Sequence, residues 1–137
     1  MAKVAFSLVL PERELVTTEA DMVVVPGGEG DFGVLPGHIP MITTVRPGVV
    51  ELYDDNKVSA RYVVAGGFAE VTPERCTVLA EEATPLAEMT ADQLAARLRQ
   101  AEEDLEDATA PAAKAAAEQA VTVAHELQRA HAYYAGR

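Results

Sequence analysis

Apolar residues follow two different patterns along the 137-residue chain. Before Pro85 they form short runs separated by turn-forming residues, and in the first run Val4, Phe6, Leu8 and Leu10 recur at every second position. A period of two places such side chains on one face of a β-strand. The runs that predict strands are 4–10, 22–25, 41–45, 49–53, 58–65, 68–71 and 76–80. Seven or more short strands joined by tight turns indicate a β-sandwich or a barrel.

The middle of this segment contains a predicted β-hairpin. Val50 and Leu52 share one face of a strand, and the sequence Asp-Asp-Asn-Lys at 54–57 separates it from the next apolar run. Asp and Asn tolerate left-handed backbone angles, which a tight hairpin turn requires. We therefore expect residues 54–57 to connect two antiparallel strands.

After Pro85 the apolar period becomes helical. Thr90 and Gln93 form a capping-box pattern, in which the hydroxyl caps an amide one turn into the helix and the Gln side chain reaches back. A first helix is thus expected to begin at Thr90. Its apolar stripe comprises Leu94, Leu98, Ala101 and Leu105.

A second helix is expected from about 111 to 134, because Pro111 suits a first helical turn. Its packing side comprises Ala113, Ala117, Ala120, Ala124 and Leu127. Two helices with a short connection favour an antiparallel hairpin. Since alanine buries little area, at roughly 25 cal/mol per Å², this hairpin needs the sandwich or a partner for stability, or else it moves.

Composition supports this division into two parts. Most Gly and Pro residues lie at or before Pro85, whereas most Ala residues lie from Ala87 onward. We therefore predict an N-terminal β-sandwich domain over 1–86 and a C-terminal two-helix domain over 87–137.

The formal net charge of -11 argues against nucleic acid as a partner, because such binding depends on Lys and Arg neutralising phosphates. The lone cysteine, Cys76, fits a reducing compartment and is expected to be a buried strand residue and not a nucleophile. The first apolar run ends at 11–14 without a cleavage site, and no run is long enough to span a bilayer. A soluble cytoplasmic protein is expected.

A glycine-rich stretch follows the predicted strand at 22–25. Gly28, Gly30 and Gly33 match the G-x-G-x-x-G pattern of dinucleotide-binding loops. That pattern needs a helix directly after it, and the Pro36-Gly37 pair prevents one. Glu29 and Asp31 also place negative charge where a pyrophosphate would sit. The glycines are instead predicted to be turn and bulge positions with positive φ.

Catalytic chemistry is not indicated by the remaining polar residues. His125 and His131 lie about 240° apart on a helix, so they cannot share a metal, and both are expected to be solvated. His38 is interpreted as a structural or interface residue, with a general base as the alternative. The acidic residues of the first helix are expected to form a solvated face: Glu102, Glu103, Asp104, Glu106 and Asp107. No metal site or cofactor is predicted.

Four motifs of the sandwich segment resemble those of a known family. They read Gly-Asp-Phe-Gly-Val-Leu-Pro-Gly-His-Ile-Pro at 30–40, Arg-Pro-Gly-Val-Val at 46–50, Gly-Gly-Phe-Ala-Glu-Val at 66–71 and Thr-Val-Leu-Ala at 77–80. In order and spacing they are similar to the epsilon subunit of bacterial F-type ATP synthase. The resemblance covers essentially the whole sandwich segment, whereas the hairpin is supported by its placement and composition.

The resemblance implies a non-catalytic subunit of the rotary central stalk. Its partners would be the gamma subunit, the membrane c-ring and the alpha and beta subunits, at the cytoplasmic face of the cell inner membrane. Membrane contact would be indirect, through the complex. The contact residues implied for the c-ring and gamma are Glu29, Asp31, Phe32, Gly33 and His38, with Asp31 foremost in the turn at 29–33.

Two departures concern regulation. Family members that bind ATP carry Leu/Ile-Asp-x-x-Arg-Ala where the hairpin begins, and here Ala87 replaces the Asp and Thr90 replaces the Arg. No nucleotide site is therefore expected. The family's hairpin inhibits ATP hydrolysis through basic residues, but the segment from Ala87 onward has five basic residues against nine acids, which implies weak inhibition. The alternative function is a stand-alone scaffold that binds a partner through its helical tail.

Overall fold

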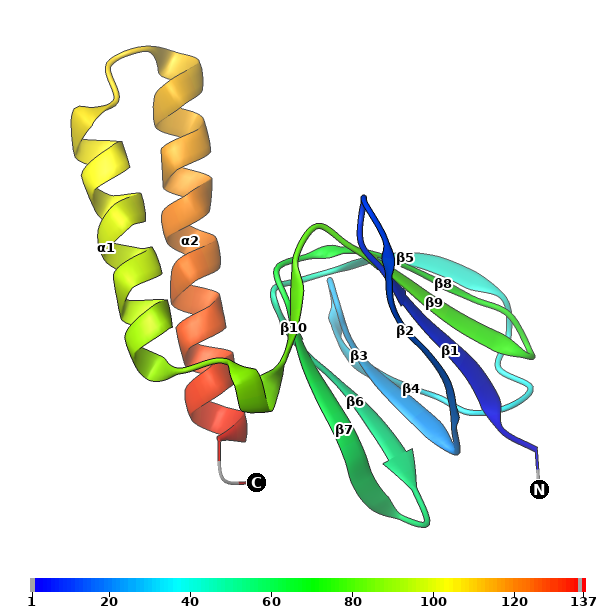
Figure 1. The fold of residues 1–137 in the computed structure, drawn as a ribbon. Helices are drawn as coiled ribbons and strands as arrows, with labels where there is room; N and C mark the ends of the chain where they lie inside the picture. The colour runs from blue at the N-terminus through cyan, green and yellow to red at the C-terminus, as the bar shows by residue number, and fades with distance from the viewer. Residues whose placement is uncertain (1, 136) are drawn as a thin grey trace.

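The computed structural model describes residues 2–135 and 137 and contains ten strands followed by two α-helices (Figure 1). The strands are β1 (Val4–Val9), β2 (Glu14–Ala20), β3 (Met22–Gly27), β4 (Gly30–Val34), β5 (Met41–Val45), β6 (Gly48–Asp54), β7 (Lys57–Val64), β8 (Gly67–Val71), β9 (Arg75–Ala80) and β10 (Ala83–Pro85). A short 3₁₀ helix, η1 (Leu86–Glu88), leads into α1 (Ala91–Asp107) and α2 (Pro111–Tyr134). The predicted fold class, a β-sandwich followed by an antiparallel helical hairpin, is confirmed.

All seven predicted strands are present, and the three additional strands have weak sequence signals. β2 has the sequence ELVTTEA, and most of its residues are exposed or half-buried, as expected at the edge of a sheet. β4 contains two glycines, and β10 has only three residues. Each is recruited by pairing with a stronger neighbour: β2 with β1, β4 with β3 and β10 with β7.

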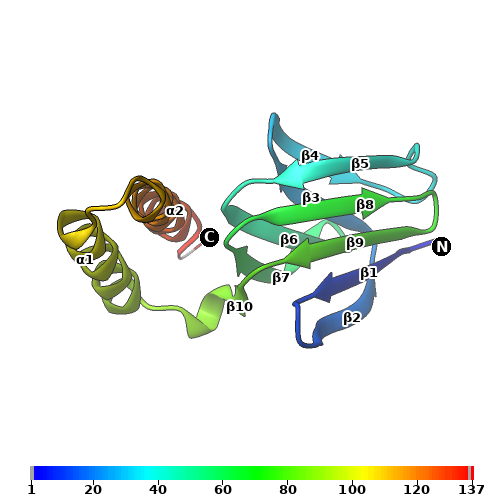
Figure 2. The ribbon, with the colours of Figure 1, turned by 90° about the horizontal axis from the view of Figure 1, so that it is seen from above.

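The strands form one sheet that folds over on itself, in the order β10-β7-β6-β3-β5-β8-β9-β1-β2, with β4 paired to β3 (Figure 2). A single residue pair, Gly27 opposite Val45, joins the two halves at β3 and β5. Neighbouring strands are antiparallel except for β1 and β9, which are parallel. The two halves face each other and enclose the core.

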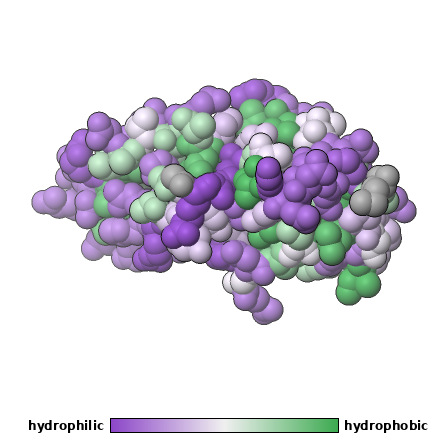
Figure 3. Space-filling view, turned by 90° about the horizontal axis from the view of Figure 1, so that it is seen from below, coloured by the Kyte–Doolittle hydropathy of each residue, from purple (hydrophilic) through white to green (hydrophobic). Residues whose placement is uncertain are grey.

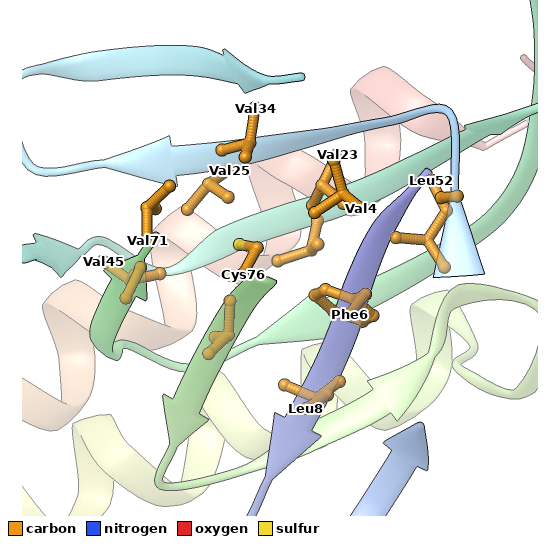
Figure 4. Close-up of a cluster of buried hydrophobic side chains, with 14 of the residues drawn as sticks. Val4, Phe6, Leu8, Val23, Val25, Val34, Val45, Leu52, Val71 and Cys76 are labelled. Carbon is orange, nitrogen blue, oxygen red and sulfur yellow. The ribbon is translucent and has the colours of Figure 1, made fainter. Parts of the chain in front are cut away.

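The core contains side chains from both halves of the sheet (Figure 4). Val4, Phe6 and Leu8 point into it from β1, each at most 1% exposed, while Leu10 packs at its margin. Val50 and Leu52 enter it from β6. The period-two prediction is therefore confirmed for both strands.

Strand β6 is buried on both faces. Val50 and Leu52 face the sandwich core, whereas Val49 on the opposite face packs with Val63 of β7 in a second, smaller cluster. Leu94 of α1 and Leu127 of α2 complete this cluster, which is the contact between hairpin and sheet. The uninterrupted burial of β6 therefore marks where the helices dock.

The predicted turns and caps are confirmed by the backbone. Asp55 and Asn56 connect β6 to β7 with φ of 52° and 64°. Thr90 caps α1: its hydroxyl accepts from the Gln93 amide at 3.1 Å, and its own amide donates to the Gln93 side chain at 2.9 Å. Both hydrogen bonds of the capping box are thus present.

The helical stripe predictions are only partly correct. Leu94, Ala101, Ala117, Ala124 and Leu127 are buried, but Ala113 and Ala120 are exposed. Ala113 and Ala120 line an open gap between the two helices, away from the sandwich, because a methyl side chain is too short to close it. Neither helix in the part of the chain that is described is long and apolar enough to cross a membrane.

Candidate interaction site

The glycine-rich stretch forms a β-hairpin. Gly28 and Glu29 make the two-residue turn between β3 and β4, with Gly27 opposite Gly30. The expected turn at 29–33 is therefore wrong: residues 30–34 are a strand, because β3 offers them a complete set of backbone partners. No helix follows, so the geometry of a phosphate cradle is not formed.

The glycines of this stretch have different roles. Gly30 and Gly37 adopt φ of 137° and 86°, which confirms the predicted left-handed backbone. Gly28 and Gly33 do not, and that part of the prediction is wrong. A Cβ on Gly28 would collide with the Thr44 side chain, and one on Gly33 would lie 3.3 Å from the Met22 sulfur. At Gly28 close packing and not backbone angle favours glycine, whereas at Gly33 a small shift of the Met22 side chain would make room for a Cβ.

Asp31 forms an ion pair with Arg46. Arg46 lies between β5 and β6; its Nη2 contacts the Asp31 carboxylate, while its Nη1 donates to the Gly27 carbonyl at 2.6 Å. Both charged side chains remain about half exposed, at 46% for Asp31 and 40% for Arg46. Glu29 is exposed at the turn itself. The hairpin tip therefore presents two accessible carboxylates, one of them oriented by an arginine.

The loop from β4 to β5 is held to the sandwich at several points. The Gly37 amide donates to the Pro73 carbonyl at 2.8 Å, and His38 Nδ1 lies 2.7 Å from the Ile39 carbonyl. Phe32 packs against the core, 6.4 Å from the His38 ring. No carboxylate contact orients His38 among the described residues, so the geometry favours its structural interpretation over a general base.

Large apolar side chains are exposed on the outer face of β5, β8 and β9. Ile42 is 72% exposed, Phe68 56% and Leu79 48%. Phe68 lies opposite Leu79 across β8 and β9, and Ile42 is diagonal to Phe68 across β5 and β8. We call these three residues the outer apolar strip. Leu35 and Ile39, both exposed, lie in the loop that leads into β5.

Two uncharged residues, Ala87 and Thr90, lie at the start of the hairpin. Ala87 lies in η1, at the edge of a cleft of about 630 Å³ between β7, η1 and the end of α2. Thr90 is occupied as the cap of α1. The residues that replace the family's binding pair therefore have a methyl group and a structural hydroxyl.

The other candidate residues have structural positions. Cys76 is buried in β9, and burial raises its thiol pKa to about 12, so it is not a nucleophile at neutral pH. His125 and the five acids of α1 are exposed, as predicted. His131 is not solvated, contrary to expectation: it is half-buried, and its Nε2 lies 3.0 Å from the Met89 carbonyl. The fold of η1 back over α2 brings these groups together.

Two known proteins are similar to this chain over most of its length. It is 54% identical to the ATP synthase epsilon chain of Paramagnetospirillum magneticum over 93% of this chain and 96% of that relative. It is 52% identical to the ATP synthase epsilon chain of Rhodospirillum rubrum, covering 89% and 91%.

Two solved structures have the same fold. A chain in the cryo-EM structure of the Euglena gracilis mitochondrial ATP synthase OSCP/F1/c-ring superposes with a TM-score of 0.76 at 26% identity, covering 95% of this chain and 82% of that one. A chain of the Tetrahymena thermophila mitochondrial ATP synthase central stalk and c-ring gives 0.69 at 16% identity, covering 94% and 96%, and shows the shared fold.

The family model of the ATP synthase delta/epsilon chain β-sandwich domain matches residues 3–86, which are the ten strands and the first residue of η1. Together with the close relatives, this match confirms the resemblance carried by the four motifs. The chain belongs to the ATP synthase epsilon chain family.

Proposed function

We propose that this chain is a non-catalytic rotor subunit of the ATP synthase central stalk, which connects the gamma subunit to the c-ring at the cytoplasmic face of the membrane. The names of its relatives and the assemblies that contain its structural neighbours support this role. A rotor part needs a rigid body with accessible contact surfaces and no active site. The family assignment favours this function over a stand-alone adaptor.

The outer apolar strip is the observation that carries the proposal. Soluble monomers seldom expose adjacent large apolar side chains, and such patches usually mark protein contacts. The surface seen from below, on the far side of the molecule from β8 and β9, is mainly hydrophilic (Figures 2 and 3). We assign the strip to gamma, because a rotor subunit needs a permanent apolar contact with the shaft that it turns with.

The tip of the β3–β4 hairpin suits a different partner. Glu29 and Asp31 are exposed carboxylates, and Arg46 limits the motion of Asp31. Charged contacts of this kind determine orientation and register more than affinity. We assign these two residues to the polar loops of the c-ring. Phe32 packs against the core below the tip, Gly33 is exposed on β4, and His38 lies in the adjoining loop.

Replacing both Ile42 and Phe68 with Asp should weaken binding to gamma at least tenfold, because two charges would be desolvated in an apolar contact. Calorimetric titration of purified gamma with the full chain measures this change. Tyr133→Asp is the matched control, since Tyr133 is 57% exposed but lies on α2. Equal binding by the double variant and the wild type would exclude the strip as the gamma contact. Failure of the unmodified chain to bind gamma would favour the adaptor function.

Magnesium ATP should not stabilise the isolated protein. Ala87 and Thr90 offer no charge to a phosphate, whereas a ligand at a hundred times its dissociation constant adds about 2.7 kcal/mol of stability, or several degrees in melting temperature. Thermal denaturation with and without millimolar magnesium ATP is the measurement. The melting temperature is expected to change by less than about 1–2 °C. The variant Ala87→Asp/Thr90→Arg provides the positive comparison. A clear upward shift for the natural sequence would contradict the prediction.

We propose that the hairpin is at most a weak inhibitor of ATP hydrolysis. From Ala87 onward, five basic residues stand against nine acids. This segment would therefore be repelled by an acidic surface over the distances at which unscreened charges act. A ligand or surface shifts a conformational equilibrium only through differential binding, which net repulsion reduces.

A further inference from the structure

The hairpin contacts the sandwich over a small area near the end of α2. Figure 1 shows both helices extending beyond the sheet, with the loop at 108–110 far from it. Among the described residues, the buried centre of this contact is Val49, Val63, Leu94 and Leu127, and six partly buried apolar residues pack around it: Ala65, Leu86, Met89, Val123, Ala130 and Tyr134. Beside them the cleft of about 630 Å³ leaves the end of α2 incompletely packed on β7. The apolar contact that holds the hairpin is therefore small and only partly buried.

A polar contact centred on Arg61 lies next to this apolar cluster. Its Nε donates to Glu51 Oε2 at 2.8 Å, and its Nη1 donates to the main-chain oxygen of Arg137 at 2.7 Å. Its guanidinium carbon lies 5.4 Å from the centre of the Tyr134 ring, within the range of a cation–π contact. One side chain thus joins β6, β7 and the last turn of α2.

Strand register explains why this pair lies under the helix. Glu51 is directly opposite Arg61, two positions from the pair formed by Val49 and Val63. The period of two places both pairs on the outer face of the sheet, and α2 covers that face. The Glu51 side chain is 8% exposed and that of Arg61 17%, so docking removes most of their water.

Burial makes each partner depend on the other. Removal of one member of a buried ion pair leaves an uncompensated charge, which is far more unfavourable than the absence of the pair. Release of the hairpin would return water to both groups. The docked position is therefore favourable only while Glu51 is paired.

We propose that Arg61, held by Glu51, is the latch that keeps the last turn of α2 on the outer face of β6 and β7, and that loss of either charge alone releases the hairpin. The sandwich core is separate, because neither residue belongs to it. The latch is a property of the chain by itself and goes beyond the proposed rotor function. Its test therefore needs no other ATP synthase subunit.

Hydrogen–deuterium exchange of the full chain tests the latch. In Arg61→Gln, amides of the C-terminal half of α2 should exchange at least tenfold faster, because a short Ala-rich helix is marginal without its docking surface. Amides of β1, β8 and β9 should remain within about twofold of the wild type, since subglobal opening leaves the global free energy unchanged. The double variant Glu51→Gln/Arg61→Gln should recover part of the protection, because it leaves no uncompensated buried charge, although the contacts of Arg61 with α2 stay lost.

Arg97→Gln is the matched control. Arg97 also joins the hairpin to the sandwich through Glu82, but that pair is exposed, at 35% and 61%, and should contribute little. Because an exposed ion pair contributes little, amide exchange in α2 of Arg97→Gln should stay within about twofold of the wild type. Unchanged exchange in Arg61→Gln, or equal acceleration in α2 and the core strands, would overturn the latch. No recovery in the double variant would also overturn it, because the single-charge penalty would then not be the cause.

Discussion

Replacement of Phe6 by Ala should lower the free energy of unfolding of the sandwich by about 3–5 kcal/mol. Phe6 is fully buried on β1 and lies between Thr18 of β2 and Cys76 of β9 in the register of the sheet. Truncation removes its transfer free energy and leaves a cavity that surrounding strands cannot close. Since domains of this kind are stable by only about 5–15 kcal/mol, this is the largest effect expected from one core truncation.

Urea denaturation followed by circular dichroism measures the change through the shift in midpoint at an unchanged slope. Phe68→Ala provides the control, because this aromatic side chain is 56% exposed on the outer apolar strip. Its free energy of unfolding should change by under about 1 kcal/mol. If the two variants were equally destabilised, the assignment of Phe6 to the core and Phe68 to a binding surface would be wrong.

Local sequence patterns predict this fold wherever one chemical rule dominates. The seven strands follow from a period of two, and the start of α1 follows from the hydrogen bonds that Thr90 and Gln93 make. β2, β4 and β10 were not predictable in this way, since their local sequence patterns are weak and each is a strand through its pairing with a neighbour across the sheet. Pairing is a long-range property that a single sequence does not reveal.

For the candidate contact residues, too, a single sequence does not reveal the long-range partners. Asp31 is found from its motif, but its partner Arg46 lies fifteen residues later and is identified only from the register of the sheet. The interpretation of Glu51 and Arg61 as a pair requires the exact alignment of β6 with β7. His131 was misjudged for a similar reason, because its partner Met89 is separated from it by 42 residues. Sequence singled out Asp31 and His131, whereas their partners and the pair of Glu51 and Arg61 are found only in the tertiary structure.

The hairpin and the sandwich should respond separately to mutation, as a boundary near residue 86 predicts. Leu127 is 2% exposed and packs with Val49, Val63 and Leu94. Leu127→Asp would place a charge in this apolar contact, with an unfavourable effect of about 3 kcal/mol or more on docking. The hairpin should detach, while the sandwich core, which contains no hairpin residue, should keep its fold.

Amide exchange and thermal denaturation of Leu127→Asp measure the two parts. Protection of α2 should fall at least tenfold, while the melting temperature of the strands should change by no more than about 4–8 °C, equivalent to roughly 1 kcal/mol. The strands of a chain ended after Glu88 should have the same melting temperature as those of Leu127→Asp, since this shorter chain keeps β10 and its pairing with β7. Thr122→Asp, at an exposed site of the same helix, should leave both parts unchanged. Loss of the strands in Leu127→Asp would show that the two segments fold as one unit.

The same variant tests whether the hairpin inhibits ATP hydrolysis once it is released from the sheet. In the assembled soluble complex, detachment frees α2 to reach the catalytic subunits, but its basic residues are few: Lys114 and Arg129 are the only Lys or Arg in its sequence. We therefore expect ATP hydrolysis by the complex with Leu127→Asp and with the chain ended after Glu88 to differ by less than about fivefold, or roughly 1 kcal/mol in activation free energy. Much slower hydrolysis with Leu127→Asp would mean that the freed hairpin inhibits strongly. Local placement of two cations would then outweigh the net negative charge of the tail, and the contact with the sheet would be what restrains the inhibitor.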